Sequence, residues 1–202
     1  MKQLFNTLPF TKITKKDYLL IVPLAEHIVS KFIFLKLKAW ELIGEYPSLH
    51  SKAHITVNHD PNIEAYIFEE KLAYYQRKMS FVNAFEIAIS GFDYFKHHAN
   101  SYTIYAKVKI DVTTKSRLSN FQHVFPKGAV KIPHITIAKT ISKKKYDILW
   151  AYFEKLNFEC SFYADKITVL ETPTRKFNNL PMRQKADIGL INAKINHWIL
   201  EN

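Results

Sequence analysis

Cysteine and glycine are scarce in this chain of 202 residues. The single cysteine, Cys160, cannot form an internal disulfide or a cysteine-rich zinc site, which argues against a disulfide-stabilised secreted scaffold and favours a reducing compartment. Only 4 glycines and 8 prolines are present, which excludes collagen-like and linker-like compositions. Because 48% of the residues are hydrophobic and 14% aromatic, the chain can bury a substantial core, and we expect one domain or two closely packed lobes.

The chain also lacks a long hydrophobic run. The most apolar segment, Tyr18–Ala25, ends at Glu26 and is far shorter than the roughly 20 residues that span a bilayer. No apolar stretch or small-residue cleavage site follows Met1 and Lys2, so no signal peptide is predicted. We therefore expect a soluble, cytoplasmic protein without a membrane partner.

Acidic residues are outnumbered: 18 Asp and Glu face 29 Lys and Arg, which leaves a net charge of +11 and a pI near 9.5. Such a field attracts polyanions, among them nucleic acids, phosphorylated metabolites and anionic membrane surfaces. The charge narrows the class of partner but does not identify the chemistry.

Hydrophobic periodicity predicts a mixture of strands and helices. Apolar and β-branched runs predict strands at Tyr18–Leu24, Ala53–Asn58, Phe85–Phe95, Tyr102–Val112, Ile132–Lys139, Phe162–Glu171 and Ala186–Ile191. Apolar residues at steps of three and four predict helices at Ala25–Gly44, Ile63–Met79, Ser116–Val124, Ser142–Leu156 and, briefly, at the C-terminus. The Asp60–Asn62 segment is expected to form a turn, and Thr172–Lys185 a loop long enough to cover a cleft. This order predicts an α+β fold with helices outside antiparallel or mixed sheets.

One tripeptide occurs twice within the predicted strands. His54-Ile55-Thr56 and His134-Ile135-Thr136 lie eighty residues apart, and each continues with a β-branched residue. A bare His-x-Ser/Thr pattern carries little information, since about one match is expected by chance in a chain of this composition. Two copies that share the apolar second and fourth positions are far less likely to arise by chance.

The strand period gives this repeat a chemical meaning. Successive side chains alternate between faces, so His54 and Thr56 share one face while Ile55 and Val57 point into the core. If both strands line one groove, two imidazoles and two hydroxyls converge. A neutral imidazole can take a proton from water or a ribose hydroxyl, an imidazolium can protonate the leaving oxygen, and the hydroxyls can donate to phosphate oxygens. This set therefore suits phosphodiester chemistry at a pH near the ordinary histidine pKa of about 6.5.

The chain opens with the strand YLLIVPL and carries paired H-x-T motifs, the second preceded by Pro133. In these features it resembles the 2H phosphoesterase superfamily, specifically the branch of bacterial 2′-5′ RNA ligase-like proteins and RNA 2′,3′-cyclic phosphodiesterases. The resemblance covers about Tyr18–Ile191 and implies a bilobal α+β fold with pseudo-twofold symmetry, in which two antiparallel or mixed sheets line a central cleft. Residues 1–202 would then form one domain of two interleaved lobes.

The resemblance also implies roles for individual residues. His54 and His134 would be the catalytic pair, and Thr56 and Thr136 the phosphate-binding hydroxyls. Lys139 stands where family members often carry arginine, and lysine keeps the charge but lacks the bidentate fork. Lys139 and Lys131, which flank the second motif, are candidate substrate-binding residues.

The same residues also have purely structural interpretations. His54 and His134 could be half-buried strand histidines satisfied by their neighbours, and threonine is favoured in strands whatever its role. The other histidines have no acidic or thiol companions at ligand spacing, so neither a metal site nor a cofactor is expected, although His59 is a candidate for the border of the cleft. Phe177, Tyr163 and Phe121 are candidates for stacking on bases of RNA.

Three hypotheses for function remain at this point. The leading one is a metal-independent, monomeric phosphoesterase acting on a 2′,3′-cyclic phosphate or 2′-5′ linkage of RNA or an oligonucleotide. The second is an RNA- or nucleotide-binding module with little or no turnover, and the third is a basic regulatory protein that uses only its surface. The sequence leaves open which histidine acts as acid, the base preference and the oligomeric state.

Overall fold

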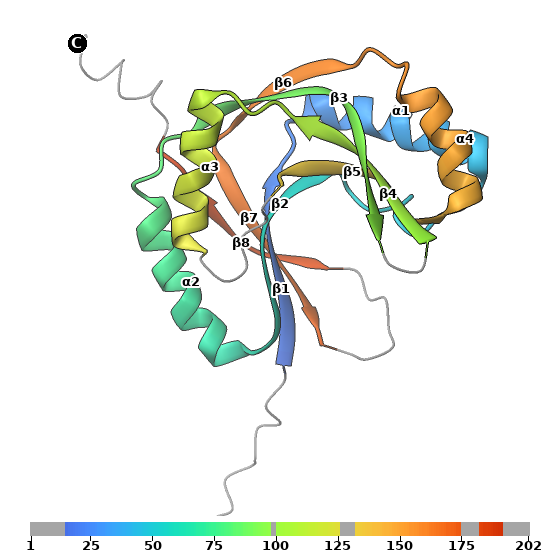
Figure 1. Cartoon of the computed structure of the whole chain (residues 1–202). Helices are drawn as coiled ribbons and strands as arrows, with labels where there is room; N and C mark the ends of the chain where they lie inside the picture. Colours follow the sequence, from blue (N-terminus) through green and yellow to red (C-terminus); the bar gives the residue numbers. More distant parts are fainter. Residues whose placement is uncertain (1–14, 98–99, 126–131, 175–181, 192–202) are drawn as a thin grey trace, which may run out of the picture.

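The computed structural model describes residues 15–97, 100–125, 132–174 and 182–191. The strands are β1 (Lys15–Pro23), β2 (His54–Glu64), β3 (Phe85–His97), β4 (Ser101–Val108), β5 (His134–Ser142), β6 (Glu159–Ala164), β7 (Lys166–Pro173) and β8 (Arg183–Gly189). The helices are α1 (Glu26–Ile43), α2 (Ala65–Met79), α3 (Val112–Val124) and α4 (Lys143–Phe153). The strands form one sheet in the order β6-β3-β4-β5-β2-β1-β7-β8, with antiparallel ladders throughout the described part (Figure 1).

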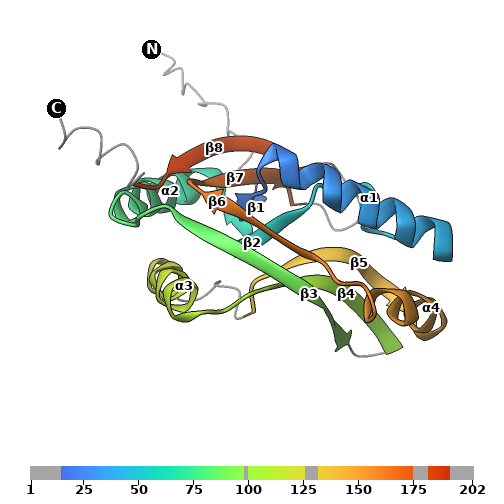
Figure 2. The same cartoon turned by 90° about the horizontal axis from the view of Figure 1, so that it is seen from above.

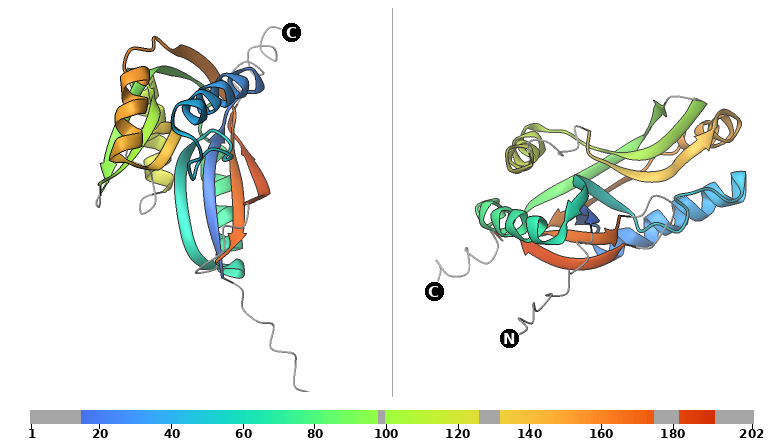
Figure 3. Two further views of the ribbon diagram at one scale, coloured as in Figure 1. Left: turned by 90° about the vertical axis from the view of Figure 1, so that its right-hand side faces the viewer. Right: turned by 90° about the horizontal axis from the view of Figure 1, so that it is seen from below.

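The sheet consists of two four-stranded halves that meet at its centre. One half is β2-β1-β7-β8 and the other is β5-β4-β3-β6. Strands β2 and β5 pair through Ile55 and Ile135, whereas the ladders within each half are longer. The two halves lie on different sides of the molecule (Figures 2 and 3). The α+β fold class is therefore confirmed, and the two predicted sheets are continuous through β2 and β5.

The helices interleave the two halves. Helix α1 follows β1 of one half, yet it contacts α4 and β5 of the other, and α3 follows β4 yet contacts α2. A single core cluster runs through both halves and includes Tyr18 and Phe68, whose rings stack in parallel, as well as Phe32 of α1 and Phe153 of α4. The predicted helical stripe on α1 is confirmed, since Ile28, Phe32, Leu35 and Ala39 are buried. In the described residues, no helix combines the length and the apolar character needed to cross a membrane.

The predicted strand Phe162–Glu171 is wrong as a single element. It is divided at Asp165 into β6, which pairs with β3, and β7, which pairs with β1 in the other half. The chain thus crosses between halves at Asp165, whose carbonyl accepts a hydrogen bond from the Leu190 N–H. Asp165 and Lys166 mark the break in the sequence, but polar residues also occur within strands, so periodicity does not reveal that the two sides pair with different strands.

The turn predicted at residues 60–62 is also wrong, because β2 continues to Glu64. Here β2 and β1 change register: Tyr18 pairs with Asp60, but Lys16 pairs with Ile63. Asn62 accommodates the extra chain in the left-handed region with φ of 58°. The turn-forming residues therefore build a strand irregularity rather than end the strand.

Several predicted boundaries shift. Strand β4 ends at Val108 rather than Val112, and α3 begins at Val112 rather than Ser116, because the Asp111 carboxylate caps the helix by accepting the Thr114 N–H at 2.7 Å. The predicted loop at Thr172–Lys185 is partly strand, since β7 extends to Pro173 and β8 begins at Arg183. The short C-terminal helix and the middle of that loop lie outside the described residues.

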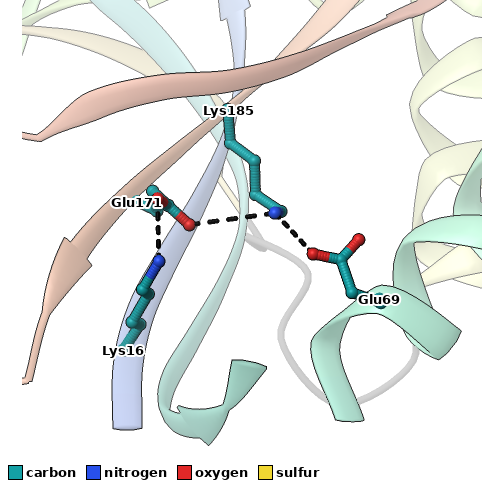
Figure 4. A network of polar contacts seen from close by, with 4 residues as sticks. All are labelled: Lys16, Glu69, Glu171 and Lys185. Carbon is teal, nitrogen blue, oxygen red and sulfur yellow. Dashed lines mark hydrogen bonds and ion pairs between the residues drawn. The ribbon is translucent and has the colours of Figure 1, made fainter. Parts of the chain in front are cut away.

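A group of charged side chains joins four elements of the first half (Figure 4). Glu171 on β7 binds Lys16 on β1 at 2.9 Å, and Lys185 on β8 lies 2.6 Å from Glu69 on α2 and 3.9 Å from Glu171. Most of these side chains are partly buried, so solvent screens them less than isolated surface pairs. The group contacts α2 through Glu69, which is 56% exposed, so that pair contributes little stability.

Candidate active site

The two His-Ile-Thr motifs open the two strands at the centre of the sheet, β2 and β5. Ile55 pairs with Ile135, and both are buried in the core. In an antiparallel ladder of this register, His54 is opposite Thr136 and Thr56 is opposite His134. All four side chains lie on the face away from the two isoleucines. The tertiary structure therefore brings together the four residues that the repeat singled out.

Each motif is followed by a β-bulge at the same position. Ile21 pairs with Thr56 but Leu20 with Asn58, so Val57 is the extra residue in β2. On β5 the extra residue is Ile137, because Tyr105 pairs with Thr136 but Ile104 with Ala138. The burial patterns of both strands agree over their first six residues as a result. Bulges of this kind redirect side chains and are frequent beside active sites.

Both imidazoles are anchored in the same way. Nδ1 of His54 lies 2.8 Å from the carbonyl oxygen of Lys52, and Nδ1 of His134 lies 2.8 Å from that of Ile132. A carbonyl oxygen only accepts hydrogen bonds, so each Nδ1 carries the proton and donates it. Nε2 is then the nitrogen left to exchange a proton with a ligand in both residues.

Burial lowers the pKa of both histidines. For His54, burial is the largest cause, and the charges of Lys36, His134 and Lys139 lower the pKa further, against the opposing effect of the hydrogen bond to Lys52. Burial likewise lowers the pKa of His134, and Lys139 adds to this effect against the hydrogen bond to Ile132. Both imidazoles are thus biased to the neutral form, in surroundings of positive charge.

Of the two candidate substrate-binding lysines, the structure describes Lys139 but not Lys131. Lys139 on β5 is exposed and close enough to lower the pKa of both histidines, while its backbone N–H donates to Ser48 Oγ. It occupies the position on β5 that exposed His59 occupies on β2, three residues after the threonine. Lys131 lies outside the described residues.

Lys36 was not anticipated from the sequence. It is buried on α1, where its ammonium group donates to the carbonyls of Ser48 and Ser51 and to Ser51 Oγ, at 2.6 to 2.9 Å. Burial lowers its pKa to about 8. The helical pattern predicts the position of Lys36 on a polar face, and only the packing of the 45–53 connection against α1 reveals that it is buried.

An aromatic group borders the second histidine and was also missed. The rings of Phe95 on β3 and Tyr105 on β4 stack at 4.3 Å, and each lies within 5.1 Å of the His134 ring. Strand alternation in the sequence indicates the face on which each of these side chains lies. Only the pairing of β3, β4 and β5 shows that the three rings are neighbours. Of the predicted stacking residues, Phe121 is buried in the core, Tyr163 packs against the core, and Phe177 lies outside the described residues. The Phe121 prediction is therefore wrong.

Metal-ligating side chains do not gather in the part of the chain that the structure describes. No group of three or more His, Cys, Asp or Glu residues there could hold an ion. The polar groups that the structure places together here are the two imidazoles, the two hydroxyls and the nearby ammonium groups.

Comparison with known proteins is consistent with this geometry. Residues 32–175, which make up most of the chain, match the family described as the 2′-5′ RNA ligase superfamily. The protein therefore belongs to that superfamily, the 2H phosphoesterases. No curated protein sequence matches the chain.

Solved structures show the same fold. LigT of E. coli complexed with 3′-AMP matches with a TM-score of 0.62 and 12% identity, over 87% of this chain and 98% of that one. LigT complexed with phosphate matches with a TM-score of 0.64 and 11% identity, over 88% and 99%. The protein TT0787 of Thermus thermophilus matches with a TM-score of 0.61 and 14% identity, over the same shares. These likenesses establish a LigT-like architecture for the chain.

Proposed function

We propose that this protein is a metal-independent phosphoesterase that hydrolyses 2′,3′-cyclic phosphate or 2′-5′ phosphodiester bonds of RNA, oligonucleotides or cyclic nucleotides. The observation that carries the proposal is the symmetric pair of imidazoles, each with Nδ1 bound to a carbonyl and each beside a threonine hydroxyl. Structures of similar fold complexed with 3′-AMP and with phosphate support a nucleotide or phosphate ligand.

Proton transfer in the proposed reaction passes through Nε2 of each histidine. Nε2 of the neutral imidazole takes a proton from water as the water oxygen attacks phosphorus. Nε2 of the other, as imidazolium, gives its proton to the departing ribose oxygen, so that one P–O bond forms and one breaks. His54 and His134 exchange these roles when the phosphate is approached from the other side.

The surrounding groups stabilise charge on the phosphate. Thr56 and Thr136 hydroxyls donate to its non-bridging oxygens, and the charge of Lys139 attracts the anion. Phe95, which is partly exposed and stacks on the buried ring of Tyr105, offers an apolar ring beside His134 for a base of the substrate. All these groups belong to one chain, so the proposed reaction requires no second subunit. The single cysteine is consistent with a reducing compartment such as the cytoplasm.

Hydrolysis of nucleoside 2′,3′-cyclic phosphates, and of a short RNA ending in one, tests the proposal. With EDTA present, His54→Ala and His134→Ala are each expected to lower kcat by about 100- to 10,000-fold, because each removes a proton-transfer group. His123→Ala is the control, since His123 is an exposed histidine on α3 that also bonds a carbonyl through Nδ1. Wild-type turnover in either active-site variant contradicts the proposal.

The alternative, a binding module without useful turnover, makes a different prediction. Such a protein needs phosphate donors but not two groups for opposite proton transfers. Nucleotide binding that persists in the double His54→Ala, His134→Ala variant, together with no product from the wild type, would support it.

A further inference from the structure

A cavity of about 720 Å³ lies between α1 and the connection at residues 45–53, and the end of β1 closes it. Its wall is mainly apolar, with side chains from all three segments. The cavity is large enough to hold a small ligand, since ligand pockets typically measure about 300 to 1,000 Å³.

The cavity adjoins the face of the sheet that carries the histidines. Ile21 and Pro23 line it, and these residues pair with Thr56 and His54 in the ladder between β1 and β2. Residues directly opposite in a ladder project to the same face. Lys52, whose carbonyl accepts the hydrogen bond from His54, is a third residue of the wall. The cavity wall therefore lies beside the strand residues of the proposed phosphate site, although neither His54 nor Thr56 itself lines the cavity.

Three large apolar side chains in the wall are about half exposed to solvent. Ile33, Leu37 and Trp40 of α1 are 53%, 49% and 44% exposed, and all three line the cavity. A cluster of apolar surface of this kind is characteristic of a binding groove. A hydrocarbon occupant would remove it from water.

The buried part of the wall favours a hydrocarbon over a nucleobase as the occupant. Lys36 is the one buried polar side chain of the lining among the described residues, and its ammonium group already has three acceptors. The other charged and hydroxyl side chains of the lining, Glu45, His50, Ser51 and Lys52, are exposed. Against the buried part of the wall, a base would lose water from its hydrogen-bonding edges without a free side-chain partner, which costs free energy. A hydrocarbon chain has no such cost.

We propose that the cavity binds the hydrocarbon part of an amphipathic phosphate ester, with the phosphate held at the His54 and Thr56 end. The positive charges of Lys36 and Lys139 beside His54 complement the anionic head, and the apolar wall complements the tail. The position of the head rests on the proposed phosphate site, whereas the position of the tail rests on the cavity alone.

Calorimetric titration with hexyl, octyl and decyl phosphate, below their micellar concentrations, tests the tail site. Affinity is expected to rise about fourfold per methylene, which corresponds to about 0.8 kcal/mol, until the cavity is filled. Leu37→Asp is expected to abolish this dependence on length. Phe34→Asp is the matched control, because Phe34 is 64% exposed on the same helix but does not line the cavity.

The outcomes separate this inference from the proposed function. Equal affinities for the three chain lengths, an unchanged affinity in Leu37→Asp, or an equal loss in Phe34→Asp would each overturn the tail site. So would a loss of affinity for a nucleoside 2′,3′-cyclic phosphate in Leu37→Asp, since it would place a base in the cavity. Dependence on chain length without hydrolysis of cyclic phosphates would leave the cavity site standing while the proposed function fails. Decyl phosphate that binds without competing with inorganic phosphate would overturn the head position.

Discussion

The Nδ1 hydrogen bonds of His54 and His134 to carbonyls two residues earlier in the chain define the chemistry at the scale of single residues. The chain just before each strand supplies the acceptor, so the tautomer of each ring follows from backbone geometry without a carboxylate partner. Burial and nearby cations then favour the neutral forms. The two rings make the same Nδ1 hydrogen bond, and they differ in the charges that surround them.

The lowered pKa values predict an acidic optimum. Hydrolysis needs one neutral and one protonated imidazole, and in the free enzyme both histidines titrate below the ordinary value of about 6.5. A plot of kcat/KM against pH is therefore expected to be bell-shaped, with its maximum below that value.

Lys139→Met tests the electrostatic origin of this optimum. Removing the cation favours both imidazolium forms, so both pKa values rise and the bell moves to higher pH. Lys144→Met is the control, because Lys144 is exposed on α4 and does not contribute to either histidine shift. A bell that stays in place in Lys139→Met, whatever its height, would show that Lys139 does not act on the histidines.

At the scale of elements, the two strands that carry the motifs are shaped by paired irregularities. The bulges at Val57 and Ile137 follow the threonines, and Asn62 and Thr140 adopt φ of 58° and 59° further along the same strands. The two bulges precede His59 and Lys139, which occupy equivalent places three residues after each threonine. Local residue preferences gave no sign of the bulges, because Val57 and Ile137 are ordinary strand residues.

Helix α3 depends on its first residues more than the sequence pattern indicates. Asp111→Ala is expected to lower the free energy of unfolding by about 1 kcal/mol, since the carboxylate caps the helix at 2.7 Å from the Thr114 nitrogen. Ser142→Ala, which removes a cap on α4 with a longer contact of 3.4 Å, is expected to cost less. Urea unfolding of both variants measures the difference, and a larger loss for Ser142→Ala would refute this ranking of the caps.

At the scale of the whole molecule, one core cluster spans both halves of the sheet, and Ile55 and Ile135 lie where the halves meet. The interleaved helices add contacts across the same boundary. We propose on this basis that the chain forms a single folding unit of two interleaved lobes rather than two independent domains.

Unfolding experiments test this unity. Ile135→Ala is expected to lower the free energy of unfolding by about 2 to 5 kcal/mol, while near- and far-ultraviolet circular dichroism still report one shared transition. Ile132→Ala, at a 54% exposed position just before β5, is expected to change it by no more than about 0.5 kcal/mol. Two separate transitions in the wild type would show that the halves fold independently.

The sequence by itself determined the centres of most strands and helices, because apolar periodicity is a local property of the chain. It also determined that His54 and Thr56, like His134 and Thr136, share a face of a strand, since that follows from alternation alone. Only the tertiary structure decided that the chain changes halves at Asp165, that Lys36 is buried, and that Phe95 and Tyr105 meet His134. These features depend on which distant segments pair. The pairing of Ile55 with Ile135 sets the four motif residues side by side. The apolar pattern of each half is local and does not specify the strand of the other half with which it pairs.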